Sequence, residues 1–270
     1  MTRDEKIAKA LLAYSQHAGY GKIASCPNLS GWGLSPETVR LVEKNPNAFL
    51  IAVLFDRMLP WEKAWEAPLQ LKRRLGHLDI HKISKMKTES LAKVLGKGRS
   101  QKSLVRFPNR MSEGLVSACR VLMIRYAGDA RNIWQRATAA VVIERLSEFE
   151  GISQKIANMT ARFLCLYYGV RFSDWGNIDM PVDRHVARLF LRAGLVKPVN
   201  SDPVQRIPNL KQAIIHKARL MSPRFPAALD EAAFEIGRYW CTSERAYCDD
   251  ESEACPLRNV CPRLIKLNVK

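Results

Sequence analysis

A lysine and an aspartate mark the starts of two successive helical segments in the middle of the chain. Residues 146–158 read LSEFEGISQKIAN, a pattern that predicts a helix, a tight turn at Gly151 and a second helix starting at Ser153. Glycine tolerates the positive φ of such a turn, and serine is a favourable N-cap. Lys155 lies one turn inside the second helix, and Asp183 opens the next one. This amine and carboxylate are the strongest chemical lead in the sequence.

The start of the second helix is also a candidate anion site. A serine cap leaves the first backbone N–H groups pointing outward, where a helix start favours negative charge. A phosphate is the expected guest, so we predict DNA contacts at Gly151, Ser153 and Gln154. For Lys155 the alternative to a chemical role is a surface cation that contacts phosphate, and for Asp183 it is an N-cap, which is compatible with catalysis.

Four of the seven cysteines are concentrated in the last thirty positions, in the pattern C-x6-C-x6-C-x5-C. Four clustered thiols in a reduced compartment favour a metal site over two disulfides. Structural zinc sites usually use pairs about two to four residues apart, and no such pair occurs here, whereas a cubane cluster accepts four thiolates from one segment. We therefore expect a [4Fe-4S] cluster, with zinc as the alternative, on Cys241, Cys248, Cys255 and Cys261. Cys119 and Cys165 fall on apolar helical stretches and are expected in the core.

The charge balance points to a polyanionic partner. The 270 residues carry a formal net charge of +17, with a pI near 9.8 and 47% hydrophobic residues. These values suit an ordered globular protein that binds nucleic acid, although a basic protein without that role is the alternative. The charged start lacks a signal peptide's apolar core, and no apolar run approaches the ~20 residues of a membrane helix. We expect an intracellular protein, cytoplasmic or, in a eukaryote, nuclear.

The elements that must position these residues are almost all helical. Apolar residues recur with the period of a helix, and strand signals are nearly absent, so the predicted class is all-α. Ser35-Pro36 should open one helix and Asn45-Pro46 should end it. Predicted helices cover residues 4–17, 49–58, 88–95, 109–126, 130–137, 139–149, 153–168, 182–194, 208–221 and 226–240, with a further helix opening at Pro60.

The segment from Lys72 to Arg106 contains eleven Lys and Arg residues but only two acidic residues. A phosphate-contacting face and a solvated, loop-rich surface are both open for this segment. Its glycines lack the spacing of a nucleotide-binding loop.

Several of these motifs together resemble the endonuclease III branch of the helix-hairpin-helix (HhH-GPD) DNA glycosylases. Residues 149–158 look like the family hairpin LPGVGRKTAN, and residues 182–186 look like its VDTHI. Residues 237–241, GRYWC, are similar to the GRYxC that leads into the family's four-cysteine loop, and residues 51–54 resemble the helix before its DNA-probing loop. The resemblance runs from about residue 36 to about residue 262.

The resemblance implies an all-α fold with a six-helix barrel and a cluster domain made of both termini. The expected barrel covers residues 48–165; residues 1–47 and 166–270, with the cysteine loop 241–261, would form the other domain. It further implies that Lys155 is the nucleophile and Asp183 its essential carboxylate. His185 is expected near the DNA or, alternatively, in the core. The partner would be duplex DNA with a lesion or abasic site, bound by a monomer.

The probing loop departs from the family pattern. Met58 and Trp61 stand where the family usually has Gln and Asp. An enzyme that flips a base must fill the gap in the stack and hold the base in a pocket. Arg57 or Met58 could fill the gap, and Asp56, Trp61 or Trp65 could line the pocket, the alternative for both tryptophans being helix packing.

Other departures concern connections. Glu150 replaces the hairpin proline, and Ser153 replaces its second glycine. The connection from Lys155 to Asp183 is longer, with Phe172, Trp175 and Asp179 in the added part, and so is the gap between Cys248 and Cys255. These changes bear on substrate range more than on reaction class.

The resemblance leads us to expect a base-excision-repair DNA glycosylase with AP-lyase activity that removes a damaged or mismatched base. Three alternatives remain at this point. One is a monofunctional glycosylase in which Asp183 activates water. Another is a non-catalytic DNA-binding protein, and the third is a zinc-stabilised structural module.

Overall fold

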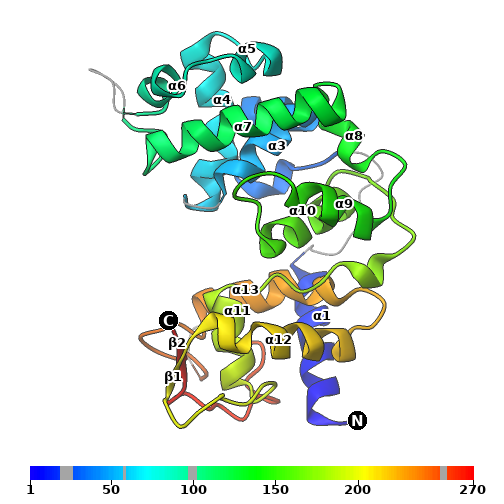
Figure 1. Ribbon diagram of the computed structural model, residues 1–270. Coiled ribbons are helices and arrows are strands. Elements are labelled where there is room, and N and C mark those ends of the chain that lie inside the picture. Colours follow the sequence, from blue (N-terminus) through cyan, green and yellow to red (C-terminus); the bar gives the residue numbers. More distant parts are fainter. Residues whose placement is uncertain (19–26, 57–58, 97–101, 250–253) are drawn as a thin grey trace. The chain divides into compact units, whose positions relative to one another are not determined.

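The computed structural model describes residues 1–18, 27–56, 59–96, 102–249 and 254–270. The described chain is mostly helical, as Figure 1 shows, and the all-α prediction is confirmed. The described strands are the short parallel pair β1 (Val204–Gln205) and β2 (Asn268–Val269). Within the described ranges, no helix has the length and apolarity needed to cross a membrane.

The chain forms two compact units. Unit 1 contains residues 1–23 and 173–270, and unit 2 contains residues 24–172. Residues 27–47 and 166–172 thus fall in unit 2, and the predicted six-helix barrel of residues 48–165 stays a prediction. Asn28 N donates to Tyr167 O at 2.8 Å, and Tyr168 Oη donates to the carbonyls of Val42 and Glu43 at 2.8 and 3.0 Å.

Unit 2 is built around α3, in which every residue from Ala48 to Phe55 is buried. A helix that is apolar on all sides must lie inside its unit, and here α4 and α7 pack against it. The elements of unit 2 are the 3-10 turn η1 (Ser30–Trp32) and the helices α2 (Pro36–Lys44), α3 (Pro46–Phe55), α4 (Trp61–Leu75), α5 (Ile80–Ser84), α6 (Thr88–Leu95), α7 (Pro108–Tyr126), α8 (Arg131–Trp134), α9 (Ala139–Ser147) and α10 (Gln154–Leu166).

One carboxylate fastens the start of α2 to α4. Ser35 caps α2 as predicted, with its hydroxyl accepting from Thr38 N at 3.3 Å. Glu66 of α4 accepts from Ser35 N at 2.7 Å and from the buried Thr38 hydroxyl at 2.5 Å. These bonds explain why α2 belongs to unit 2.

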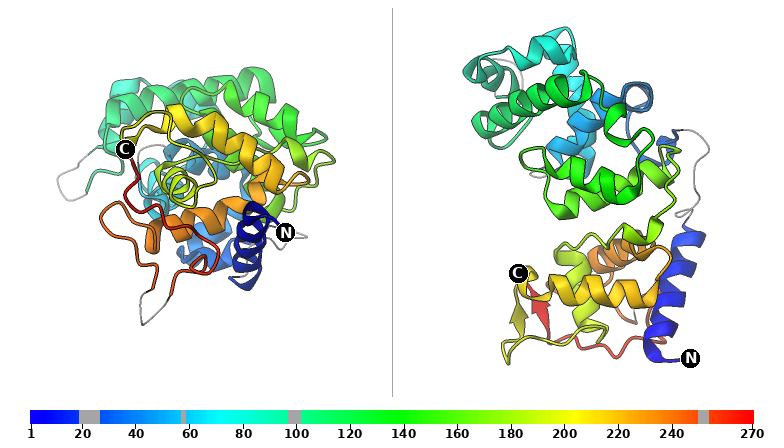
Figure 2. Two further views of the ribbon diagram at one scale, coloured as in Figure 1. Left: turned by 90° about the horizontal axis from the view of Figure 1, so that it is seen from below. Right: turned by 45° about the vertical axis from the view of Figure 1, so that its right-hand side comes forward.

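Unit 1 packs its helices around a separate core, and Figure 2 shows α1 running beside the C-terminal helices of the same unit. Residues from both ends of the chain fill this core, among them Ile7, Leu11, Phe190 and Ile236. The elements of unit 1 are α1 (Arg3–His17), η2 (Trp175–Asn177), α11 (Arg184–Arg192), β1, α12 (Ile207–Met221), η3 (Pro226–Leu229), α13 (Asp230–Tyr239) and β2.

Candidate active site and cysteine loop

The predicted helix-hairpin-helix is present in unit 2 as α9, a tight turn and α10. Gly151 has a φ of 89°, in the left-handed region that only glycine enters at little cost. Ile152 N closes the turn by donating to Phe149 O at 3.0 Å. Ser153 caps α10, because its hydroxyl accepts from Ile156 N at 3.4 Å. The local structure expected from the sequence is therefore found.

Lys155 lies half-buried in the first turn of α10. Among the described residues, its amino group makes no hydrogen bond or ion pair, but it interacts electrostatically with Asp56. Asp56 follows the last residue of α3, and its backbone N–H donates to Ala52 O at 3.1 Å. The structure thus brings one predicted pocket residue into the electrostatic range of the predicted nucleophile.

The environment of Asp56 favours the protonated carboxyl. Burial raises the pKa of Asp56 from 3.8 to about 7, the nearby Lys155 cation opposes this rise, and Glu62 adds to it. Desolvation disfavours the charged form of an acid, whereas a neighbouring cation favours it. Here burial is the larger effect.

Asp183 caps α11 in unit 1. Its Oδ1 accepts from the backbone N–H groups of His185 at 2.8 Å and Val186 at 2.9 Å. Within the described part of the chain, Oδ2 accepts no hydrogen bond. The cap role and an available carboxylate oxygen therefore coexist in one side chain. The predicted pairing of Lys155 with Asp183 joins residues of different units and stays a prediction.

His185 lies half-buried beside Asp183 and packs edge-to-face on Phe234, with ring centroids 5.4 Å apart. Its Nδ1 is 3.1 Å from Nη2 of Arg188. Burial lowers the pKa of His185, the carboxylate of Asp183 opposes this, and Arg188 adds to the lowering. The packing on Phe234 agrees with the alternative of a core histidine, and the predicted DNA contact stays a prediction.

The two tryptophans predicted for the base pocket differ in exposure. Trp65 is 1% exposed and packs edge-to-face against Trp32 and Phe49, with centroids 4.7 and 5.5 Å apart. This placement supports the alternative of helix packing for Trp65. Trp61 is half-buried and packs edge-to-face on Trp32, with ring centroids 6.0 Å apart. Arg57 and Met58, the predicted DNA wedge, lie outside the described residues.

Sequence reasoning did not single out Trp32, which is the centre of this aromatic cluster. It lies in η1 and also contacts Phe163 and Tyr167 of the α10 region, with centroids 4.9 and 5.0 Å apart. Gly33 directly after it was the available signal, because its φ of 68° lies in the left-handed region that favours glycine. Trp32 thereby connects the start of α4 to the hairpin helix that carries Lys155.

The four predicted ligands lie together at the end of unit 1. Each of the Cys241, Cys248, Cys255 and Cys261 thiols interacts electrostatically with the other three. Cys241 and Cys255 are buried, and the other two are half-buried. Burial raises the pKa of Cys255 to about 12. Among the described side chains, no group of three or more His, Cys, Asp and Glu is arranged to hold a metal ion, and the predicted cluster stays a prediction.

Two buried arginines of α11 hold the start of the cysteine loop. Arg188 donates to the carbonyls of Cys241 and Gly237 at 2.5 and 2.6 Å. Arg192 donates to the carbonyls of Thr242 and Leu267 at 2.7 and 2.6 Å, and its Nη1 is 3.6 Å from the Cys241 sulfur. Arg263 N donates to the Cys261 sulfur at 3.4 Å. N–H groups directed at sulfur suit thiolate ligands of an iron–sulfur cluster.

Both arginines were missed by sequence reasoning. The available signal was their spacing, since residues four apart lie on the same face of a helix. The surrounding α11 residues from Val186 to Leu191 are all buried, and a buried arginine needs fixed partners.

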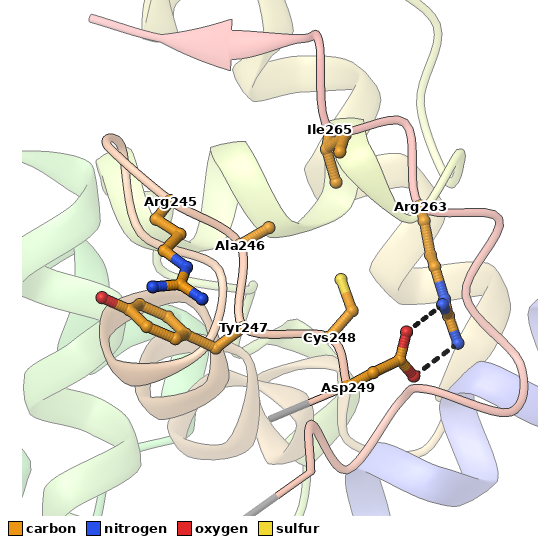
Figure 3. Close-up of a pocket in the computed structure, with 7 residues that line it drawn as sticks. All are labelled: Arg245, Ala246, Tyr247, Cys248, Asp249, Arg263 and Ile265. Atoms are coloured by element: carbon orange, nitrogen blue, oxygen red, sulfur yellow. Dashed lines mark hydrogen bonds and ion pairs between the residues drawn. The ribbon is translucent and has the colours of Figure 1, made fainter. Parts of the chain in front are cut away.

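A shallow pocket of about 310 Å³ opens beside Cys248, as Figure 3 shows. Asp249 and Arg263 form an ion pair on one side of it, with Nη2 and Oδ1 3.0 Å apart. On the other side, the Arg245 guanidinium lies over the Tyr247 ring, 4.8 Å from its centroid. The pocket is lined by Arg245, Ala246, Tyr247, Cys248, Asp249, Arg263 and Ile265.

The added residues before Asp183 are largely fixed in unit 1. Trp175 of η2 packs edge-to-face on Phe225, with centroids 5.0 Å apart. Asp179 accepts from Nε and Nη2 of Arg219 at 2.6 and 3.0 Å. These contacts therefore hold the segment that leads to Asp183 against other residues of unit 1.

Comparison with known proteins identifies the fold. No family model and no curated protein matches the sequence. A solved structure of a trapped endonuclease III–DNA covalent intermediate matches 98% of this chain and 99% of its own, with a TM-score of 0.63 and 17% identity. A thermostable thymine-DNA glycosylase matches 98% of this chain and 97% of its own, with a TM-score of 0.60 and 14% identity. The chain therefore has the helix-hairpin-helix glycosylase fold over nearly its full length.

Proposed function

We propose that this protein is a base-excision DNA glycosylase with an associated AP-lyase activity. Its substrate would be duplex DNA with a damaged or mismatched base, and Lys155 would be the nucleophile. The observation that carries the proposal is the placement of Lys155 in the first turn of the hairpin helix. There the residue is half-buried, and its amine has no hydrogen-bonded partner among the described residues and interacts electrostatically with the Asp56 carboxyl.

A lysine amine suits this reaction when it is uncharged. The neutral amine attacks C1′ of the flipped nucleotide, the glycosidic bond breaks, and a Schiff base forms between Nζ and C1′. The Schiff base acidifies the proton on C2′, so that β-elimination releases the 3′ phosphate. A free lysine has a pKa of ~10.4, so the site must favour the neutral amine.

Asp183 would stabilise the positive charge that builds on the sugar as the base departs. Two backbone N–H groups fix the side chain through Oδ1, which supports a role for Oδ2 in facing the substrate. A preorganised carboxylate is more effective than a mobile one, because it needs no rearrangement during the reaction.

The hairpin would bind the DNA backbone. The turn at Gly151 leads into α10, where the Ser153 hydroxyl accepts from Ile156 N. The N–H groups of Gln154 and Lys155 have no acceptor among the described residues, and a helix start attracts phosphate. The net charge of +17 adds a general attraction to DNA. The DNA complex of the structurally similar endonuclease III supports this partner.

We further propose that Cys241, Cys248, Cys255 and Cys261 hold a [4Fe-4S] cluster. The mutual proximity of the thiols and the N–H groups directed at Cys241 and Cys261 fit a four-thiolate site. The cluster would supply a cross-link that closes the C-terminal loop. The Arg192 cation would offset the negative charge of the thiolates.

Borohydride trapping tests the function. Borohydride reduces a Schiff base to a stable amine, so a lyase becomes covalently linked to DNA with a damaged base. We expect wild-type protein to be trapped and Lys155→Ala not to be trapped. Base release without trapping would indicate a monofunctional glycosylase, and DNA binding without base release would indicate a non-catalytic protein; either result would overturn the bifunctional proposal.

A further inference from the structure

Asp56 carries a carboxyl group at a position that destabilises negative charge. It follows the C-terminal end of α3, where the helix dipole is negative and a carboxylate is destabilised. The helix it ends is buried from Ala48 to Phe55, so the carboxyl is also partly removed from water. Among the described residues, its side chain has no hydrogen-bond partner to offset this cost. A residue that is unfavourable for the stability of its own helix, with no contact that offsets the cost, is typical of a functional site.

Two charged groups on other helices of unit 2 interact electrostatically with Asp56. Lys155 lies in the first turn of α10, and Glu62 lies in the first turn of α4. The Lys155 amine and the Asp56 carboxyl interact electrostatically, but no hydrogen bond joins them. Among the described residues, each group therefore keeps its hydrogen-bonding capacity for a third one. In the proposed reaction, that group is the flipped nucleotide.

We propose that Asp56 is a catalytic residue that accepts a proton from Lys155 and delivers it to the departing base. This inference rests on the proposed glycosylase function. It assigns one group in unit 2 to both of the proton transfers that base displacement by an amine requires.

The proton and electron balance is complete with these groups. The Asp56 carboxylate takes a proton from the Lys155 ammonium group, which leaves a neutral amine and a neutral carboxyl. The amine forms the Nζ–C1′ bond as the glycosidic bond breaks, and the electron pair of that bond leaves with the base nitrogen. Asp56 then protonates this nitrogen. A further proton moves from Nζ to O4′ as the sugar ring opens, and the Schiff base results.

The acidity of Asp56 matches both steps. With a pKa of about 7, the carboxyl is present in both protonation states near neutral pH. A general acid–base catalyst works best when its pKa lies near the operating pH. Burial and Glu62 favour the protonated state, and Lys155 favours the ionised one.

Two DNA substrates separate the role of Asp56 from that of Lys155. A duplex with thymine opposite guanine, or with thymine glycol, requires base departure, whereas a duplex with a preformed abasic site does not. We expect Asp56→Asn to lower base release by about 100-fold or more, the range of general acid–base catalysis. On abasic DNA, its borohydride trapping should recover as the pH rises, because hydroxide can then take the proton from the amine in place of Asp56.

Asp129→Asn is the matched control, since Asp129 lies in the same unit and pairs with Arg131 on the surface. It should release base at the wild-type rate, and thermal melting should show that both variants are folded. Base release by Asp56→Asn within twofold of wild type would overturn this inference alone. A wild-type protein inactive on base-containing and abasic DNA would overturn the proposed function as well.

Discussion

The backbone of Gly237 on α13 packs directly against the backbone of His185 on α11. A Cβ atom at Gly237 would lie 2.4 Å from the His185 carbonyl oxygen and 2.8 Å from its carbonyl carbon. Real Cβ contacts are never this short, and neither neighbour is a flexible side-chain end. The contact fixes α13, which leads to Cys241, against the helix capped by Asp183. It gives a physical reason for the glycine in the GRYWC segment.

Gly237→Ala should therefore separate these helices. We expect a loss of roughly 2–4 kcal/mol in the free energy of unfolding, at or above the usual cost of overpacking, and reduced activity because Asp183 shifts. Chemical denaturation measures the loss. Gly31→Ala is the control, because its Cβ would meet no atom within 4 Å. Equal stability of the two variants would contradict the close contact.

Gly151→Ala should strain the hairpin turn. The φ of 89° at this residue is unfavourable for a residue with a Cβ, at a cost of roughly 1–2 kcal/mol. We expect a lower melting temperature and weaker binding to undamaged duplex DNA. Fluorescence anisotropy with a labelled duplex measures the binding, and unchanged affinity would argue against contacts between the hairpin and DNA.

Asp56→Asn should change how stability depends on pH. The raised pKa, from 3.8 to about 7, means that the folded protein binds more protons than the unfolded chain in this window. Stability of the wild type must then fall as the pH rises from about 4 to about 7. The asparagine variant lacks this penalty. It should be the more stable protein at pH 8, by a few kcal/mol at most, since a tenfold change in acidity corresponds to ~1.4 kcal/mol.

Asp79→Asn provides the control of opposite sign. The backbone N–H of Lys82 lowers the pKa of Asp79, so its carboxylate stabilises the fold above its unfolded pKa and loses this effect as the pH falls. The variant should be slightly less stable than wild type at neutral pH and equal to it in acid. Denaturation curves across the pH range test both signs, and parallel curves for the two variants would contradict the assignment.

Most helices of the fold can be predicted from the sequence. The predicted helix at residues 88–95 agrees with α6 (Thr88–Leu95), because its apolar period ends at a glycine. The α5 helix (Ile80–Ser84) was missed. It is too short for a period to show, and its N-cap Asp79 was the local signal. The β1–β2 pair was also missed, since each strand has two residues and forms only through a distant partner.

The site was predictable where local chemistry defines it. The turn at Gly151 and the caps at Ser153 and Asp183 follow from residue preferences that need no tertiary information. The electrostatic interaction of Asp56 with Lys155 depends on the tertiary packing of unit 2, which the sequence does not display. The burial of Trp65 also depends on tertiary packing. The apolar pattern of one helix does not show whether a side chain lies in the core or lines a pocket.

Arg192→Met should weaken the cysteine loop. The substitution leaves the partly buried carbonyls of Thr242 and Leu267 without their donor, and a fully buried unsatisfied acceptor costs ~1–3 kcal/mol, which is an upper bound here. We expect lower melting temperature and lower iron content per protein, measured by chemical iron assay. Arg258→Met is the control, since Arg258 is exposed. Equal iron content in the two variants would argue against a role for Arg192 at the proposed cluster.

The identity of the nucleophile is tested most directly by locating the covalent link to DNA. Wild-type protein, reduced with borohydride on a duplex with an abasic site, should carry the DNA remnant on the peptide that contains Lys155, as read by mass spectrometry. Lys155→Ala should carry none at any pH. A remnant found on another lysine, or trapping that persists in Lys155→Ala, would contradict the account.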